Sequence, residues 1–286
     1  MERMTYPRSI LARPAVRGAL AAAAFLTLAG IAIAADRMAS ESRGSGSPTI
    51  VLIHSIGGDR SDWDSVAPAL AKRHRLLLVD LPGHGRSGPP DKVTVAAAAR
   101  SLEQVLARNK VTGAVLVGHS YGALVALEAA VDQPKCAAAV VAIDAATFTQ
   151  ADSAQVAEVE RILRERYPVF VRAIYERMST DQVQCDSLIA HAIRVKPEVL
   201  GAYFRDAWRV DLRPRIKSMT TPVHLIATSM LWPSAESWTS ARARLGYATA
   251  GPAMGYRILD SAHYITIDQP DSLVQVIERI SEQTSR

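Results

Sequence analysis

The apolar stretch AVLVGHSYGALVALEAA, residues 114–130, carries three consecutive polar residues near its centre. His119, Ser120 and Tyr121 stand between Gly118 and Gly122, with a valine-rich run before them and an alanine-rich run after them. The first run is typical of a buried strand and the second of a helix. The stretch therefore predicts a strand over 111–118 that passes directly into a helix over 121–132.

Gly118-x-Ser120-x-Gly122 has the spacing of a nucleophile elbow. Because the chain turns within one residue, the serine takes a strained backbone conformation and its neighbours two positions away must lack side chains. The turn places the hydroxyl at the carboxyl edge of the sheet, above the positive end of a helix. An ordinary turn of small residues is the alternative, but the flanking strand and helix favour Ser120 as a nucleophile.

The same alternation of strand and helix continues along the chain. Continuous apolar strands between helices predict an α/β fold with a mostly parallel sheet. Between about residues 147 and 218 no strand is evident and helical periodicity dominates, which predicts a helical insertion on the sheet domain. The expected strands are 49–54, 75–80, 111–118, 138–144, 222–227 and 256–259, and the expected helices include 61–72, 94–107, 121–132 and 271–283.

The first 34 residues have the pattern of a secretion signal. Arginines precede the apolar stretch GALAAAAFLTLAGIAIA (18–34), which ends in the small-x-small sequence Ala32-Ile33-Ala34. A membrane span needs about 20 apolar residues, so a cleaved signal peptide over 1–34 is favoured over an uncleaved anchor. We therefore expect a secreted or periplasmic protein, with a polar linker over 35–48 before the domain.

Composition narrows the class of protein. The chain has 286 residues, 49% hydrophobic and 21% charged, which suits one or two globular domains. The formal net charge of +5 comes partly from the leader, and no Lys/Arg run with interleaved aromatics indicates nucleic-acid binding. No Cys and His spacing predicts a metal site. Cys136 and Cys185 would pair in an oxidising compartment or remain two buried thiols, and the sequence leaves both open.

A serine hydroxyl needs a base that removes its proton. His263 lies in RILDSAHYITID (257–268), just after the last expected strand and before the final helix. A loop residue there reaches over the sheet edge, so His263 is the predicted base. His119 is held by the elbow, and His54 and His84 lie in turns where they hydrogen-bond locally. The other histidines, His74, His191 and His224, have no motif context.

The reaction also needs hydrogen-bond donors for a developing oxyanion. VLIHSIGGDRSDW (51–63) follows the first strong strand and places a small-residue turn beside the elbow. The backbone N–H groups of Ile56 and Tyr121 are the predicted pair. The alternative is that this glycine-rich turn is an ordinary loop.

Taken together, these segments resemble the α/β-hydrolase superfamily. LIHSIGG (52–58) looks like its oxyanion loop, although the family usually has His-Gly where this chain has His-Ser. The resemblance spans residues 49–146 and 219–284. It implies an eight-stranded, mostly parallel sheet, a core of 49–146 with 219–286, a helical cap over 147–218 after the sixth strand, and no cofactor. The other matching motifs are the turn DLPGHGRSG (80–88), the elbow GHSYG (118–122) and the histidine loop SAHYITIDQP (261–270).

The third member of the expected triad departs from the family pattern. Most relatives have an aspartate after the seventh strand, but TPVHLIATSMLWP (221–233) carries Met230 there. A histidine without an acid lacks its orienting partner. Asp144, at the end of AAVVAIDAA (138–146), is the favoured acid because some relatives carry it at the end of the sixth strand. Glu236 is the alternative acid, Asp260 and Asp268 are expected to brace the histidine loop, and a dyad stays open.

Aromatic residues gather in the expected cap. Seven of the sixteen in the chain lie between residues 147 and 218. They either roof the site for an acyl or aryl group or pack the cap onto the sheet domain, and packing is favoured for most of them. The seven are Phe148, Tyr167, Phe170, Tyr175, Tyr203, Phe204 and Trp208; Trp232 and Trp238 are further candidates for the pocket edge.

We expect a serine hydrolase that cleaves a small carboxylic ester through an acyl-enzyme. The resemblance also leaves amidase, lactonase, perhydrolase, C–C cleavage and lyase activity open. It disfavours dehalogenation, which uses an aspartate where this chain has Ser120. The missing acid motivates a non-catalytic ligand-binding protein as an alternative. The expected partner is a small-molecule ester, with no nucleic acid and membrane contact only through an uncleaved leader; the sequence does not indicate an oligomeric state.

Overall fold

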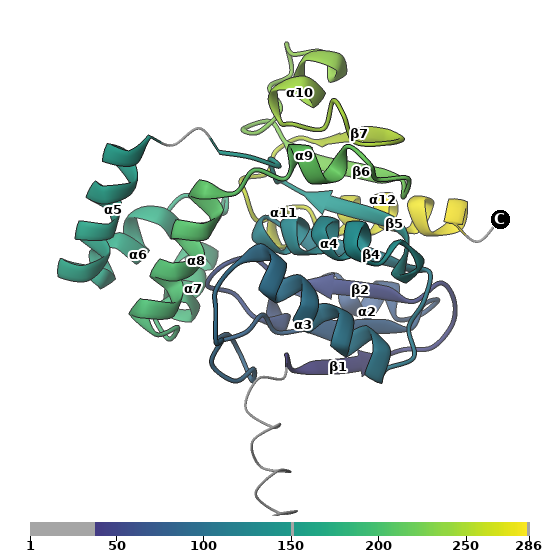
Figure 1. Cartoon of the computed structure of the whole chain (residues 1–286), viewed down its shortest axis with the longest axis horizontal. Coiled ribbons are helices and arrows are strands. Elements are labelled where there is room, and N and C mark those ends of the chain that lie inside the picture. The colour runs from purple at the N-terminus through teal and green to yellow at the C-terminus, as the bar shows by residue number, and fades with distance from the viewer. Residues whose placement is uncertain (1–37, 150–151, 285–286) are drawn as a thin grey trace, which may run out of the picture. The chain divides into compact units, whose positions relative to one another are not determined.

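One mixed sheet forms the centre of the computed structural model (Figure 1), with the strand order β1-β3-β2-β4-β5-β6-β7. The seven strands are those of the residues that the structure describes, 38–149 and 152–284. β1 runs antiparallel to β3, and the other neighbouring strands are parallel. The strands are β1 (Ser40–Arg43), β2 (Ile50–Ile53), β3 (Leu76–Val79), β4 (Ala114–His119), β5 (Ala137–Ile143), β6 (Val223–Thr228) and β7 (Ala253–Ile258).

Six of these strands lie where the sequence predicts them, and the seventh corrects the prediction of a linker. Residues 40–43, expected within the linker 35–48, form β1 instead. β1 pairs with β3 alone, at the edge of the sheet, so its sequence SESR needs no apolar run and gave no strand signal. The resemblance implied eight strands, but the described residues form seven.

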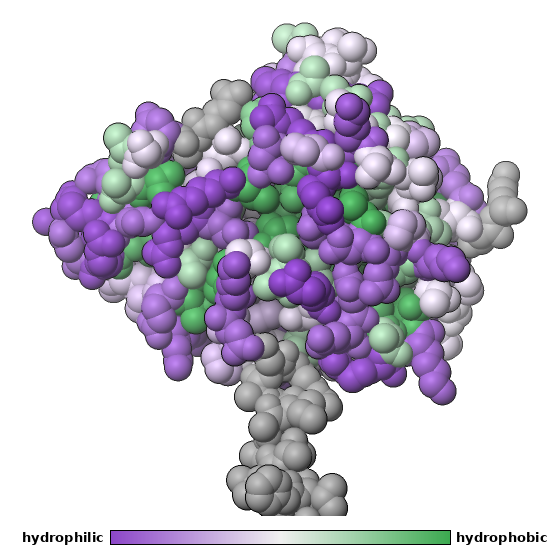
Figure 2. Space-filling view, viewed as in Figure 1, coloured by the Kyte–Doolittle hydropathy of each residue, from purple (hydrophilic) through white to green (hydrophobic). Residues whose placement is uncertain are grey.

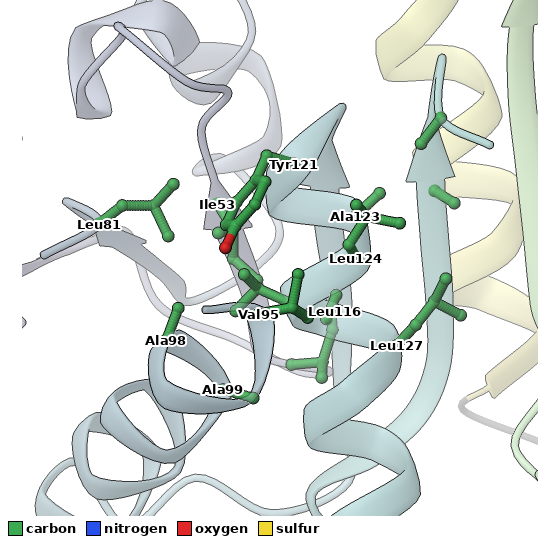
Figure 3. Close-up of a cluster of buried hydrophobic side chains, with 14 of the residues drawn as sticks. Ile53, Leu81, Val95, Ala98, Ala99, Leu116, Tyr121, Ala123, Leu124 and Leu127 are labelled. Carbon is green, nitrogen blue, oxygen red and sulfur yellow. The ribbon is translucent and has the colours of Figure 1, made fainter. Parts of the chain in front are cut away.

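Alternate residues of the central strands point to opposite faces of the sheet. Val51 and Ile53 of β2 pack on the face covered by α3 (Val95–Arg108) and α4 (Tyr121–Asp132). Leu116 of β4 and Leu124 and Leu127 of α4 belong to the same buried cluster (Figure 3). Ile50 and Leu52 of the same strand pack with η1 (Arg60–Trp63), α2 (Ala67–Leu70) and α12 (Pro270–Thr284) on the other face. Burial on both faces explains why these strands are continuously apolar.

A helical insertion follows β5, the fifth strand of the described sheet rather than a sixth. Its helices α5 to α8, called the cap below, lie to one side of the sheet in Figure 1, and their outer surface is mainly hydrophilic (Figure 2). An isolated antiparallel bridge between Phe148 and Asp211 joins the two ends of the insertion. The cap helices are α5 (Ser153–Glu165), α6 (Tyr167–Tyr175), α7 (Gln182–Ala192) and α8 (Pro197–Arg209).

Short helices complete the chain. They are η2 (Pro134–Cys136), α9 (Arg213–Ile216), α10 (Trp238–Arg244) and α11 (Ile265–Asp268). Among the described residues, no helix has the length and apolar character needed to cross a membrane. The predicted signal peptide, 1–34, lies outside the described residues. Cys136 and Cys185 are both buried free thiols, which decides between the two states that the sequence left open.

Candidate active site

The turn between β4 and α4 has the strained geometry that the sequence predicts. Ser120 takes φ 53° and ψ −116°, a region that residues with a side chain rarely enter. Its backbone N–H donates to the carbonyl of Ile143 at 2.8 Å, which holds the turn on β5. A Cβ at Gly118 would lie 2.2 Å from the Gly122 carbonyl oxygen, and one at Gly122 would lie 2.4 Å from that of Ile53. Both glycines are therefore required by close backbone contact.

His263 and Asp144 meet beside this turn. The Nδ1 atom of His263 lies 2.7 Å from Asp144 Oδ2, a hydrogen bond between the loop after β7 and the end of β5. The other oxygen, Oδ1, accepts from the Thr228 backbone N–H at 2.9 Å and from its hydroxyl at 3.0 Å. Asp144 is only 7% exposed, so neighbouring strands hold its carboxylate almost without water. With Nδ1 bound in this way, Nε2 is the ring nitrogen of His263 that remains for proton transfer.

His119 links the histidine loop to the elbow. Its Nε2 donates to the backbone carbonyl of His263 at 2.9 Å, and the two ring centroids are 4.6 Å apart. Burial is the main cause that holds the pKa of His119 well below its ordinary value, so the ring is neutral. Sequence reasoning considered His119 only as a rival base and missed this contact; its position next to Ser120 was the available signal.

The loop of His263 thus lies against the elbow that carries Ser120, but no hydrogen bond joins the two side chains. Within the described residues, the Ser120 hydroxyl has no hydrogen-bond partner, while His263 bonds through Nδ1 and through its carbonyl. Such bonds are often long without substrate and tighten when substrate binds. The histidine loop nevertheless rests on the elbow through His119, the residue that precedes the serine.

The predicted oxyanion donors lie on the two loops that follow neighbouring strands, β2 and β4. A Cβ on Gly122 would lie 2.6 Å from the carbonyl oxygen of His54, so the loop after β2 touches the elbow directly. Neither the Ile56 N–H nor the Tyr121 N–H donates to another residue that the structure describes. Tyr121 begins α4, where backbone N–H groups lack partners within the helix. Both N–H groups are therefore available to a ligand oxygen.

Two buried histidines shape the loop that carries Ile56. The Gly57 N–H donates to His84 Nε2 at 3.1 Å, and the Leu81 N–H donates to His54 Nε2 at 2.8 Å. Each accepting nitrogen must be unprotonated. Burial is the main cause that lowers the pKa of His54 to about 4 and that of His84 to about 3. Both histidines bond within their own turns, as the sequence predicts, and each also bonds to the other's segment, which the sequence did not indicate.

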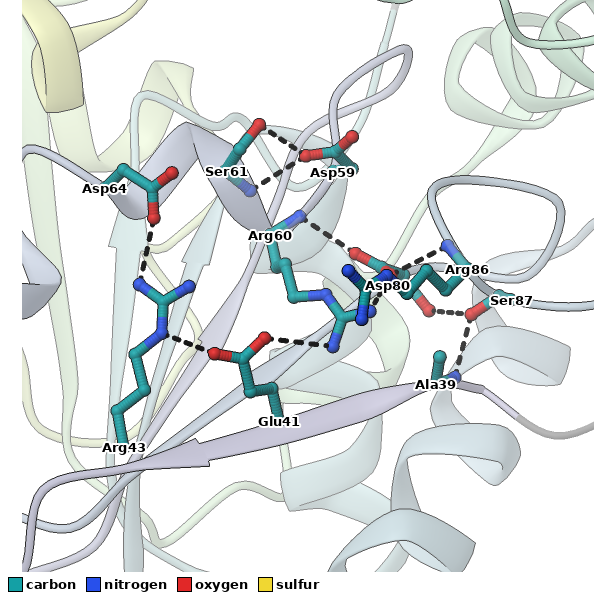
Figure 4. A network of polar contacts seen from close by, with 10 residues as sticks. All are labelled: Ala39, Glu41, Arg43, Asp59, Arg60, Ser61, Asp64, Asp80, Arg86 and Ser87. Atoms are coloured by element: carbon teal, nitrogen blue, oxygen red, sulfur yellow. Dashed lines mark hydrogen bonds and ion pairs between the residues drawn. The ribbon is translucent and has the colours of Figure 1, made fainter.

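Asp80 anchors the turn that carries His84 (Figure 4). The carboxylate accepts from the backbone N–H groups of Arg60 and Arg86, each at 2.9 Å, and pairs with the Arg60 guanidinium at 2.9 Å. Its backbone carbonyl accepts from the Ser87 hydroxyl at 2.6 Å. Asp80 is fully buried and Arg60 begins η1 just after Gly58. One aspartate therefore ties the start of η1 to the turn after β3.

We expect the free energy of unfolding to fall as the pH drops from about 6.5 towards 4. An unfolded histidine binds a proton near pH 6.5, whereas folded His54 binds one only near pH 4, so acid favours the unfolded chain. For His54, this shift in pKa corresponds to a loss of about 3 kcal/mol in the free energy of unfolding. Urea unfolding at several pH values measures it.

His84→Gln is the matched variant for this pH dependence. Its amide oxygen still accepts from the Gly57 N–H but does not titrate, so we expect a shallower loss of stability in acid than in the unmodified protein. If the free energy of unfolding fell equally steeply with pH in both proteins between pH 6.5 and about 4, His84 would not be a source of the acid sensitivity.

The structure brings Asp144 to His263 and leaves the other acids elsewhere. Met230 is 71% exposed. Glu236 pairs with the Arg244 guanidinium at 2.6 Å, and this hydrogen bond is the main cause that lowers the Glu236 pKa. Asp260 contributes its carbonyl to the Gln269 side chain. Asp268 accepts from the Ala262 N–H at 2.8 Å and so braces the histidine loop, as expected.

The cap aromatics join the cap to the core loops or stack on one another. The Tyr203 hydroxyl donates to the Pro82 carbonyl at 2.8 Å, and the Tyr121 hydroxyl donates to Asp206 of α8 at 2.7 Å. Phe204 contacts two other aromatic rings of the cap, with centroid distances of 5.2 and 5.5 Å. Trp232 and Trp238 stack on each other at 5.1 Å. Packing therefore accounts for these rings.

The remaining histidines lie apart from this site. His74 contacts Glu278 at 3.1 Å, and His224 stacks on Tyr256. His191 lines a cavity of about 290 Å³ between η1 and α7. In the described ranges, no three His, Cys, Asp or Glu side chains are grouped so that they would hold a metal ion.

Comparisons with known proteins agree with this architecture. Residues 50–276 match the model described as "Alpha/beta hydrolase family". The sn-1-specific diacylglycerol lipase ABHD11 of Xenopus tropicalis is 34% identical over 108 residues, which are 36% of this chain and 34% of that protein. The aligned part thus spans about a third of that relative.

Solved structures resemble the whole sheet and cap. A hydrolase from Oleispira antarctica has a TM-score of 0.78 at 14% identity, covering 87% of this chain and 96% of its own. The enol-lactonase from Burkholderia xenovorans LB400 has a TM-score of 0.74 at 20% identity, covering 85% of this chain and 95% of its own. At these identities the likeness is one of fold.

Proposed function

The chain belongs to the alpha/beta hydrolase family, and from this premise we propose that it is a serine hydrolase that cleaves a small carboxylic ester through an acyl-enzyme. The observation that carries the proposal is the 2.7 Å hydrogen bond between His263 Nδ1 and the buried Asp144 carboxylate, formed beside the strained elbow of Ser120. A base oriented by an acid next to a serine at a strand end is the arrangement that acyl transfer uses.

In the first half-reaction, Ser120 Oγ attacks the ester carbonyl carbon while His263 Nε2 takes the hydroxyl proton. The bond from Oγ to carbon forms, and the carbonyl π-electrons move to oxygen. Asp144 stabilises the resulting imidazolium through Nδ1. The intermediate then expels the alcohol, which receives its proton from His263, and the acyl group stays on Ser120.

In the second half-reaction, water repeats these steps on the acyl-enzyme. His263 takes a proton from water as its oxygen attacks the acyl carbon. The bond to Ser120 Oγ breaks and the serine recovers its proton from the imidazolium. The free carboxylic acid leaves, and no outside oxidant, reductant or metal enters the balance.

The Ile56 and Tyr121 N–H groups stabilise the negative oxygen in both half-reactions. Their lack of protein acceptors in the described residues supports this role. Donors held in place before the reaction stabilise charge without reorganising, and one such donor is worth about 10²- to 10³-fold in rate.

Esters are the preferred substrate class for two reasons. The site offers two neutral backbone N–H donors, which suit the oxygen of an uncharged ester carbonyl. The similar proteins include a diacylglycerol lipase and an enol-lactonase, whose names describe reactions at ester carbonyls. A lactone is a cyclic ester, so lactone opening is the second candidate and uses the same residues.

We expect the purified protein to hydrolyse p-nitrophenyl acetate or butyrate, with a burst of nitrophenol that reflects acylation. A panel of longer acyl chains, a lactone and a nitroanilide separates esterase from lactonase and amidase. Turnover confined to lactone or anilide would reassign the substrate. No turnover on any member, together with no covalent labelling by a fluorophosphonate, would favour the ligand-binding alternative.

A further inference from the structure

The end of cap helix α6 touches both loops of the candidate active site. The Tyr175 hydroxyl donates to the Ile56 carbonyl at 2.6 Å. Three residues later, the Met178 carbonyl accepts from the Tyr264 N–H at 2.8 Å, directly after His263. This segment, residues 175–180, is called the α6 brace below. It connects the loop of the predicted oxyanion donor with the loop of the predicted base.

On the oxyanion side, one peptide group is held at both of its ends. Tyr175 binds the carbonyl of the Ile56–Gly57 peptide, and His84 accepts from its N–H at 3.1 Å. The neighbouring peptide carries the Ile56 N–H, and the two peptides share one Cα. Holding the Ile56–Gly57 peptide therefore restricts rotation of the Ser55–Ile56 peptide. This second peptide has to point the Ile56 N–H at a substrate oxygen.

The contact is close and shielded from water. Tyr175 is 3% exposed, and a Cβ added to Gly57 would lie 2.2 Å from its hydroxyl oxygen. Gly57 has φ 77°, so this glycine allows both the turn and the approach of the phenol. Burial raises the pKa of Tyr175, which keeps the hydroxyl a donor throughout the working pH range.

On the histidine side, the brace binds the loop through a carboxylate. The Ser179 hydroxyl donates to Asp268 Oδ1 at 2.5 Å, and the Thr180 N–H donates to the same atom at 3.1 Å. The second oxygen of Asp268 accepts from the Ala262 N–H at 2.8 Å, one residue before His263. The cap therefore supports the base as well as the oxyanion loop.

We propose that Tyr175 is a positioning residue of the reaction: from the cap, it holds the Ile56–Gly57 peptide so that the Ile56 N–H faces the oxyanion, while Ser179 holds the loop of His263. The inference rests on the proposed function. The cap is then part of the catalytic geometry, because a misplacement of about 1 Å in such a site costs about 10²-fold in rate.

Tyr175→Phe removes the hydroxyl and keeps the ring. We expect kcat on p-nitrophenyl butyrate to fall about 10- to 100-fold with KM within about twofold, since the lost alignment matters most when the oxyanion forms. A trifluoromethyl ketone, whose carbonyl carbon bonds to Ser120 Oγ and whose oxygen becomes an oxyanion, should bind more weakly by the same factor. A purely structural role would not link these two losses.

Tyr167→Phe is the matched control. Its hydroxyl donates to the Ala192 and Val195 carbonyls inside the cap, at 3.1 and 2.7 Å, and contacts neither loop. We expect it to lose comparable stability and to keep kcat and ketone affinity. If Tyr175→Phe melts too early for kinetics, Ser179→Ala tests the other arm of the brace, with an expected fall in kcat of about tenfold at unchanged KM.

The outcomes separate the two proposals. A serine-dependent wild type whose Tyr175→Phe and Ser179→Ala variants match the Tyr167→Phe control would overturn the positioning role alone. A wild type without turnover or fluorophosphonate labelling would overturn the proposed function and the positioning role with it. A loss of kcat and ketone affinity confined to the brace variants supports both.

Discussion

Replacing Ser120 with alanine is expected to lower kcat on the ester substrate by about a millionfold, close to the loss seen when a serine protease loses its nucleophile. Alanine has no group that can form the acyl bond, so the covalent path ends. The elbow itself should persist for two reasons. Alanine has a Cβ as serine does, so the strain at φ 53° is similar, and the backbone N–H of residue 120 still donates to the Ile143 carbonyl. Steady-state hydrolysis, fluorophosphonate labelling and thermal unfolding measure the three consequences.

Ser101→Ala is the matched control for this variant. Ser101 is a half-buried serine of α3 whose hydroxyl donates to the Ala97 carbonyl at 3.2 Å, away from the elbow. We expect wild-type kcat from it. Equal activity in Ser120→Ala and the wild type would reject Ser120 as the nucleophile, whatever the fold.

Replacing Asp144 with asparagine is expected to lower kcat by about 10⁴-fold, with the fold retained. The amide oxygen can still accept from Thr228, but the amide that then faces His263 Nδ1 donates a hydrogen bond. An amide donor at Nδ1 favours the His263 tautomer with its proton on Nε2, and that nitrogen then cannot take the proton from Ser120. The substitution also removes the negative charge that stabilises the imidazolium. Kinetics at pH about 7 to 8, near the optimum for a histidine base, measure the loss.

Glu236→Gln provides the comparison, because Glu236 was the alternative acid in the sequence. Its pairing with Arg244 lies near the surface, where solvent screens an ion pair and little stability depends on it. We expect kcat within about twofold of wild type, since Glu236 contacts no residue of the site. A dead Glu236→Gln beside an active Asp144→Asn would reverse the assignment of the acid.

The position of the acid has a simple structural explanation. β5 and β6 are adjacent and parallel, so their carboxyl ends lie side by side. Asp144 directly follows β5 and takes φ 47°. Thr228, the last residue of β6, binds its carboxylate through both the backbone N–H and the side-chain hydroxyl. The end of β6 thus supports the acid rather than supplying it. Met230 is then free of any role at the site and is exposed to solvent.

Several features followed from local sequence. The elbow was predicted from Gly118, Ser120 and Gly122 alone, because the spacing of glycines and the change of hydrophobic period both lie within one short stretch. Six strands were found because burial on both faces makes them continuously apolar. β1 was missed because an edge strand with one partner carries no such signal. The signal peptide, export and the catalytic roles stay predictions.

By itself, the sequence determined the α/β class, the strained turn at Ser120 and the candidate base His263, since each depends on residues close together along the chain. Only the tertiary structure decided which carboxylate meets that base. Asp144 and His263 are 119 residues apart, and three other acidic residues, Glu236, Asp260 and Asp268, lie near the expected positions in the sequence. It also decided that His119 and Tyr175 support the loops. The physical reason is that hydrogen bonds between loops depend on strand order and packing, which bring distant residues to one sheet edge.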